Sequence, residues 1–214
     1  PTMKPEELRY FVDEAHRLVI QVIMANPLSV DSRSIGSYME IWQAEPSDID
    51  AFWSSYESLT TSTSAIAKEY GVEIMAVACA SLDLVGPSTW ENRDKTSDAL
   101  IRIANATRKF FEGPLVAYLG KIQQPFPRPR VLAEVPFWEA VDIISISAYN
   151  GWQPLTDNVA PSYEEMVDGW KRIIAEELQP FQERWDKPFI AMESSCFSIE
   201  GGARWHGYGA CSDR

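Results

Sequence analysis

The sequence is poor in the residues from which metal centres and catalytic triads are built. Its 214 residues include two histidines and three cysteines. Neither His16 nor His206 has a serine or cysteine partner at the spacing of a hydrolase motif. The cysteines, Cys79, Cys196 and Cys211, show no CxxC spacing, and an odd number of them gives no disulfide framework. We therefore expect neither a metal site nor a cofactor.

Long apolar runs, excess basic charge and glycine-rich loops are also missing. No apolar run approaches the roughly 18 residues of a membrane span. The 31 acidic residues outnumber the 19 basic ones, giving a net charge of −12, which argues against nucleic acid or an anionic membrane as a partner. No glycine-rich phosphate loop follows an apolar segment, so the main signature of a nucleotide-binding sheet is lacking. A neutral substrate such as a sugar is compatible with these properties.

The segments that are present alternate between short apolar runs and amphipathic stretches. Strands are predicted at residues 19–25, 72–80, 115–119, 142–149 and 188–193, and helices at residues 5–18, 47–70, 95–111 and from 162 onward, with a short helical turn at 136–141. This order predicts a parallel sheet covered by helices. Five strands fit either a doubly wound open sheet or part of a (β/α)8 barrel. A full barrel needs about 250 residues, so as a barrel this chain is about three βα units short.

Four local signals set helix ends. Ser47 is the expected N-cap of the second helix, and Gly71 is its expected C′ glycine. Ser162 and Glu165 have the spacing of a capping box. Pro180 is expected to kink or end the helix that Ser162 begins.

The last predicted strand ends in a carboxylate. Five mostly apolar residues from Pro188 lead directly to Glu193, and a small polar turn follows. Barrels and α/β sheets place their chemistry at the carboxyl ends of strands. Glutamate is almost never fully buried unless it is paired. Glu193 is therefore a candidate catalytic residue, and a salt bridge to a neighbouring strand end is the structural alternative.

Three segments, in this order along the chain, resemble glycoside hydrolase family 113, the β-mannanase-like members of the clan of retaining (β/α)8 glycosidases. They are Trp53–Tyr56 with Ala67–Gly71, Phe137–Asp142 running on to Tyr149, and Lys187–Glu193 followed by Ser198–Gly202. The resemblance implies an α/β fold, a partial (β/α)8 TIM barrel from about strand three to strand seven, with the first two units and the last one missing. It also implies that residues 1–214 form a single incomplete domain.

The resemblance assigns roles in a reaction that needs two carboxylates about 5–5.5 Å apart. Glu193 matches the nucleophile, and Tyr149 matches a tyrosine that supports it. The acid/base glutamate of the family closes strand four, where this chain has Ala80, which cannot carry a proton. Asp83 lies three residues further on. A misplacement of about 1 Å can cost on the order of a hundredfold in rate, so Asp83 is a poor substitute.

Substrate contacts are expected from loops at the same face. Asn26 begins the segment that matches the polar end of the family's strand three, and Trp152, Trp205 and His206 are candidates for a sugar platform. Ordinary loop packing explains these three residues equally well.

Three functions remain open on the sequence. The first is a retaining glycosidase, a polysaccharide hydrolase of the mannanase type, with Glu193 as nucleophile and activity impaired by Ala80. The second is a non-catalytic carbohydrate-binding homologue, and the third is an unrelated α/β protein with coincidental strand ends. The expected partner is an oligo- or polysaccharide, and the complete protein is expected to be a monomer. Secretion suits such a hydrolase, although residues 1–8 resemble a helix start and not a signal peptide.

Overall fold

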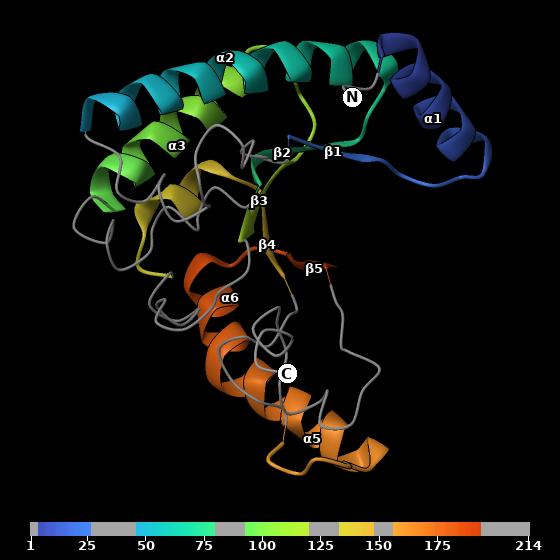
Figure 1. The fold of residues 1–214 in the computed structure, drawn as a ribbon, viewed down its shortest axis with the longest axis vertical. Coiled ribbons are helices and arrows are strands. Elements are labelled where there is room, and N and C mark those ends of the chain that lie inside the picture. The colour runs from blue at the N-terminus through green and yellow to red at the C-terminus, as the bar shows by residue number, and fades with distance from the viewer. Residues whose placement is uncertain (1–3, 27–45, 80–92, 120–132, 148–155, 194–214) are drawn as a thin grey trace, which may run out of the picture.

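The computed structural model describes residues 4–26, 46–79, 93–119, 133–147 and 156–193 (Figure 1). The strands are β1 (Ile23–Ala25), β2 (Ile74–Cys79), β3 (Leu115–Leu119), β4 (Ile143–Ser147) and β5 (Phe189–Glu193). The helices are α1 (Pro5–Arg17), α2 (Pro46–Tyr70), α3 (Arg93–Thr107), the 3-10 helix η4 (Pro136–Ala140), α5 (Tyr163–Ile173), the π-helical turn η5 (Ile174–Leu178) and α6 (Gln179–Trp185).

The five strands form one parallel sheet whose spatial order is the order of the chain, β1-β2-β3-β4-β5. Parallel neighbours are joined by right-handed crossovers, so an unreversed order places successive helices on the same face. Figure 1 shows α2, α3 and α6 on one side of the strands. A doubly wound sheet reverses its order at a switch point, and this sheet does not. The topology is that of a partial (β/α)8 barrel, as the resemblance implied.

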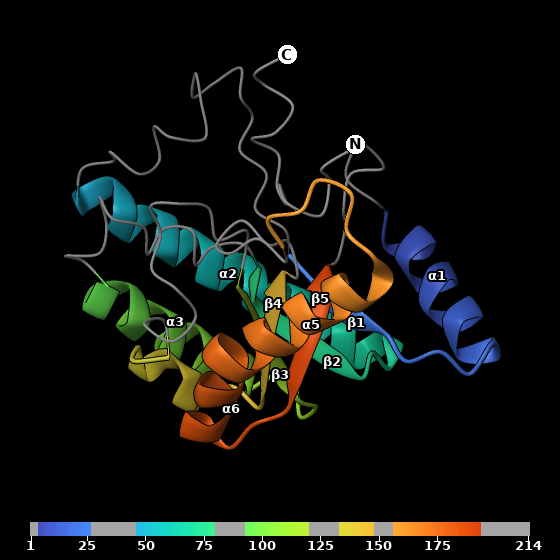
Figure 2. The same cartoon turned by 90° about the horizontal axis from the view of Figure 1, so that it is seen from below.

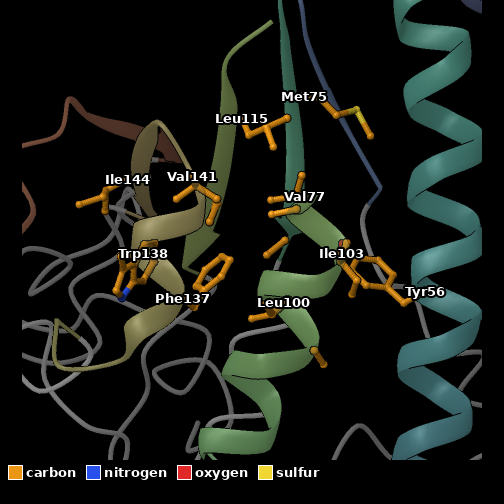
Figure 3. Close-up of a cluster of buried hydrophobic side chains, with 14 of the residues drawn as sticks. Tyr56, Met75, Val77, Leu100, Ile103, Leu115, Phe137, Trp138, Val141 and Ile144 are labelled. Atoms are coloured by element: carbon orange, nitrogen blue, oxygen red, sulfur yellow. The ribbon is translucent and has the colours of Figure 1, made fainter. Parts of the chain in front are cut away.

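The helix-facing side of the sheet carries the main core. Met75, Val77, Leu115 and Ile144 are buried there against helix residues such as Leu100 and Ile103 (Figure 3). The aromatic rings of the 3-10 helix, Phe137 and Trp138, close this core beside β4, and the ring of Phe181 lies 5.0 Å from that of Trp138 in an edge-to-face arrangement. Hydrophobic packing therefore fixes the outer layer of the barrel.

The opposite side of the sheet has a smaller apolar cluster. Ala76, Val116 and Ile143 are buried, and residues of β1, β2 and β5 pack against them. Side chains alternate along a strand, so these residues mark the inner face of the barrel. The register confirms it, because Ala25, Ala76, Val116 and Ile143 lie in one row across four strands.

Two irregularities interrupt the register. Between β2 and β3 the pairing passes from Ala76 to Ala78, and between β4 and β5 it passes from Ala191 to Glu193. Val77 and Met192 are therefore the extra residues of β-bulges, each of which moves the following residues of its strand by one position. In β2 the bulge allows Val77 and Ala78 both to join the helix-side core.

Several helix ends follow the sequence signals. Gly71 has φ +75 after α2, as expected for a C′ glycine. The Ser162 hydroxyl accepts from the Glu165 N–H, and the Glu165 carboxylate accepts from the Ser162 N–H, which confirms the capping box. Helix α2 begins at Pro46, so Ser47 is not its N-cap residue. The helix passes Pro180 because the π-helical turn directly before α6 changes the hydrogen-bond pattern there.

The first strand is shorter than predicted. Its expected start, Val19, has φ +60 and belongs to the turn that ends α1. The Ile20 N–H donates to the Ala15 carbonyl at 2.9 Å, which ties residues 18–20 to the helix. The prediction that the strand begins at residue 19 is therefore wrong, and strand pairing with β2 begins at Ile23.

Acidic residues placed directly before a strand fasten the amino-terminal edge of the sheet. A carboxylate oxygen of Glu73 accepts from the Val22 N–H at 2.8 Å, and the other lies 3.0 Å from His16 Nε2. Asp142 accepts from the Leu115 N–H at 2.7 Å. Each carboxylate thus joins its own strand to the strand before it.

A lysine fastens β5 at the same edge. The Lys187 ammonium donates to the carbonyls of Trp138 and Glu139 within η4 and of Val141 just beyond it. Burial lowers the pKa of Lys187. Three carbonyl acceptors compensate an ammonium that is partly removed from water.

Candidate active site

The carboxyl ends of the five strands lie at one edge of the sheet, since all five run parallel (Figure 2). The strands end there at Ala25, Cys79, Leu119, Ser147 and Glu193. In α/β barrels this edge carries the reacting groups and the opposite edge serves stability. Functional groups are therefore expected at this edge of the sheet.

Glu193 is the last residue of β5, and the bulge decides its register. Ser145 pairs with Ile190, and Ser147 pairs with Glu193, so Met192 is skipped. Along β4, Ile143, Ser145 and Ser147 occupy alternate positions, and Ile143 belongs to the inner-face cluster. The bulge therefore brings Glu193 into the register row of an inner-face position. Bulges are over-represented beside active sites, where they re-aim a residue.

Asn26 directly follows β1 at the same edge. Asn26 as a whole is half-buried. Its side-chain nitrogen Nδ2 is buried and has no hydrogen-bond partner in the described part of the chain. Buried polar groups in proteins are normally satisfied by protein, water or ligand. The Asn26 amide thus has no partner in the described part of the chain, and its role in substrate binding stays a prediction.

Ser145 is a second buried polar group of this kind. It lies in the middle of β4, is 0% exposed, and its hydroxyl has no hydrogen-bond partner among the residues described. Sequence reasoning missed it. The available signal was the alternation in Ile143-Ile-Ser-Ile-Ser147, which places two hydroxyls on one face of an otherwise apolar strand.

The strongest evidence on relationship comes from comparison with known proteins. The sequence model of Glycoside Hydrolase Family 113 matches residues 1–207. The chain belongs to glycoside hydrolase family 113. The family resemblance of the three segments is thereby confirmed. No curated protein matches the chain.

Solved structures of this family have the same fold. The GH113 β-mannanase AaManA from Alicyclobacillus acidocaldarius, in complex with ManMIm, matches with a TM-score of 0.68 and 20% identity, over 95% of this chain and 56% of the mannanase. A complex of a GH113 β-1,4-mannanase matches with a TM-score of 0.54 and 20% identity, over 94% of this chain and 55% of the other. This family 113 chain therefore spans about half the length of these mannanases.

Several predicted site residues lie outside the described residues. These are Ala80, Tyr149, Trp152, Trp205 and His206, and Asp83 is a further one. Ala80 directly follows Cys79, the last described residue of β2. Their roles in this family 113 protein stay predictions.

Two groups with shifted pKa values lie at the amino-terminal edge of the sheet. The hydrogen bond from the Val22 N–H, assisted by His16, lowers the pKa of Glu73 at the amino end of β2. Lys187, whose pKa burial lowers, lies before β5. Both groups belong to the edge that serves stability in barrels. None of the described helices is long and apolar enough to cross a membrane.

Proposed function

We propose that this family 113 protein acts on β-linked mannan-type polysaccharide through Glu193 as a retaining nucleophile. The observation that carries the proposal is the position of Glu193, which ends β5 across a bulge in the register row of Ser147. The substrate class is taken from the two similar structures, which are a β-mannanase and a β-1,4-mannanase.

In this proposal the Glu193 carboxylate attacks the anomeric carbon and displaces the leaving oxygen. A covalent glycosyl-enzyme forms, and water then releases the sugar with retention of configuration. Tyr149 donates a hydrogen bond to the carboxylate and keeps it ionised, because a hydrogen bond to the charged form favours that form. Asn26 offers its buried amide N–H to a sugar hydroxyl, and Trp152, Trp205 and His206 form the surrounding sugar platform.

The second carboxylate of the retaining reaction has no counterpart at residue 80, where the side chain is that of Ala80. A missing general acid removes a factor of ~10²–10⁴ in rate. The loss is largest for natural glycosides, whose leaving alkoxide must be protonated. We therefore propose that the nucleophile is retained and that acid/base catalysis is impaired.

Ala80 also favours a second candidate function. A family member without its acid/base can retain sugar affinity after turnover is lost, as a non-catalytic carbohydrate-binding homologue. In that case the aromatic platform and Asn26 would still hold mannan oligosaccharides, and Glu193 would carry no chemistry.

The two functions are separated by chemical rescue of the full-length protein. An aryl β-mannoside with a good leaving group needs no acid, and azide needs no base to attack the intermediate. We expect β-mannosyl azide to form, and to be lost in Glu193→Gln. The matched control is Glu183→Gln, which makes the same change at an exposed carboxylate of α6. We expect this variant to keep the activity.

Absence of turnover with and without azide, together with binding of mannan oligosaccharides, would establish the binding function. Azide product formed equally well by Glu193→Gln would refute Glu193 as the nucleophile. An α-mannosyl azide product would refute the retaining mechanism.

A further inference from the structure

Helix α1 and the turn after it carry neighbouring apolar side chains that are exposed to solvent. Phe11 is 58% exposed, Leu18 56%, Val19 92% and Ile20 54%. Phe11 and Leu18 lie seven residues apart, about two helical turns, so they share one side of α1. Exposed apolar residues scattered singly are ordinary, whereas a contiguous group marks an interaction surface. These four residues are called the α1 patch below.

The turn that presents three of these residues has an unusual conformation. Val19 has φ +60, in the left-handed region. A β-branched residue is strained there, and glycine or asparagine adopts this angle at a lower cost. The turn is fixed by two hydrogen bonds of 2.9 Å, from the Val19 N–H to the His16 carbonyl and from the Ile20 N–H to the Ala15 carbonyl. Solvent exposure alone gives no reason for an apolar, branched residue at this position.

The α1 patch lies on the side of α1 that does not meet α2. On the α2 side, Arg9 forms an ion pair of 2.7 Å with Glu69, and its guanidinium carbon lies 4.4 Å from the centre of the Tyr70 ring. Phe11 follows Arg9 by two residues, which is about 200° around a helix. Figures 1 and 2 show α1 at the outer end of the helix layer, beside β1. The patch is thus on the free side of this outermost helix.

The sheet is open at β1. Within the described part of the chain, β1 is the first strand in the sheet order and pairs with β2 alone. The Ile74 N–H donates to the Val22 carbonyl at 3.2 Å, so Val22 and Met24 direct their backbone groups toward β2. Backbone groups alternate between the two sides of a strand, so those of Ile23 and Ala25 point to the open edge. Such an edge is a template for a further strand.

The topology indicates which segment belongs at this edge. Helix α2 joins β1 to β2, and α3 joins β2 to β3, each as the helix of a βαβ unit. Helix α1 leads into β1 in the same way, so the strand that completes its unit comes before α1 in the sequence. The unreversed strand order then places that strand beside β1. Members of the family are long enough to contain it, since this chain covers 56% of the mannanase AaManA.

We propose that the α1 patch and the open edge of β1 bind the strand that precedes α1 in the complete protein, together with the helix before that strand. The strand pairs in parallel with β1 through Ile23 and Ala25, and the helix packs on Phe11 and Leu18. Strand pairing satisfies the backbone groups of the edge, and helix packing removes apolar side chains from water. The inference is independent of the proposed role of Glu193.

The first test is hydrogen exchange of the full-length protein, resolved to single amides and measured at low and high protein concentration. We expect the Ile23 and Ala25 amides to exchange about a hundredfold or more slowly than in an unstructured peptide, as the Met24 amide does through its pairing with β2. Fast exchange at Ile23 and Ala25 beside a protected Met24 would overturn the proposal. Protection that appears only at high concentration, with a dimer in sedimentation, would identify a second copy as the occupant and would also overturn it.

The second test compares Leu18→Gln with Leu59→Gln in the full-length protein. Leu59 is a matched control, because it is 48% exposed on α2 and undergoes the same change. If Leu18 is covered by the preceding helix, its replacement should lower the urea midpoint of unfolding by about 0.5–1 M, whereas Leu59→Gln should shift it by less than about 0.2 M. Equal shifts in the two variants would refute the covering of the α1 patch. Neither test measures turnover, so failure of the proposed function would leave this inference standing.

Discussion

Glu73 makes the contact whose removal can be predicted in most detail. Its carboxylate accepts from the Val22 N–H at 2.8 Å and lies 3.0 Å from His16 Nε2. It therefore joins three elements, the end region of α1, the start of β1 and the start of β2. About a third of the side chain is exposed to solvent, as is a similar share of His16. The contact is partly buried, so it should contribute measurably to stability.

The magnitude follows from the two partners. A hydrogen bond to a charged group contributes about 1.5–3 kcal/mol, and partial exposure places this one near the lower end. The pair with His16, in which about a third of each side chain is exposed, adds up to about 0.5 kcal/mol. Glu73→Ala removes both and leaves the Val22 N–H without its acceptor, so we expect a loss of about 2 kcal/mol. Glu73→Gln keeps an amide oxygen as acceptor, and we expect a loss of about 1 kcal/mol.

The effect should depend on pH in a defined direction. The Val22 N–H, with a smaller contribution from His16, lowers the pKa of Glu73 below its ordinary 4.5. A carboxyl whose pKa is lower in the folded state stabilises the fold fully above its unfolded-state pKa. This contribution is lost as the pH falls through the folded-state pKa. The difference between the parent and Glu73→Gln should therefore be larger at pH 7 than at pH 3.

The assay is urea unfolding of the full-length protein at both pH values. Glu69→Gln is the matched control, because Glu69 lies in a more exposed ion pair with Arg9, with 64% of its side chain accessible. That change should cost less than about 0.5 kcal/mol. A Glu73→Ala loss no larger than that of Glu69→Gln would refute the reasoning, and so would a Glu73→Gln difference that grows toward low pH.

Two further predictions concern the opposite roles of the two edges. Lys187→Met removes the donor to the carbonyls of Trp138, Glu139 and Val141. We expect the free energy of unfolding, measured by urea titration, to fall by about 2 kcal/mol. A loss below about 0.5 kcal/mol would show that these hydrogen bonds contribute little to stability. Ala80→Glu should raise turnover of unactivated mannan oligosaccharides by about 10²-fold or more, since a general acid is restored, while leaving the activated aryl mannoside almost unaffected. An equal effect on both substrates would contradict that assignment.

The sequence predicted the order of elements better than their ends. Strand β3 occupies its predicted range, and the capping box at Ser162 begins a helix as expected. The wrong prediction at Val19 has a physical cause, because an apolar residue can occupy either a turn after a helix or the start of a strand. The turn and the strand start differ in the backbone angle φ, which the residue type does not reveal.

The candidate site was predicted only in part. Glu193 could be placed at a strand end because an apolar run leads into one carboxylate. Its register row could not, because the bulge at Met192 lies in a run whose composition fits a regular strand equally well. Ser145 was missed because a serine inside a strand is ordinary until its burial and lack of a partner are known. Asp142 belonged to a recognised motif, but its bond to the Leu115 N–H required the fold.

The bulge at Met192 means that the pairing of β5, and not its composition, decides which register row Glu193 occupies. In a regular strand over the same residues, Met192 would pair with Ser147, and Glu193 would fall one step later, on the face that meets the helices. Deletion of Met192 would make the glutamate the direct successor of Ala191, and it would pair with Ser147 without a bulge. Loss of this residue should therefore be tolerated at the strand end, whereas insertion of one residue after Met192 would turn the carboxylate to the opposite face.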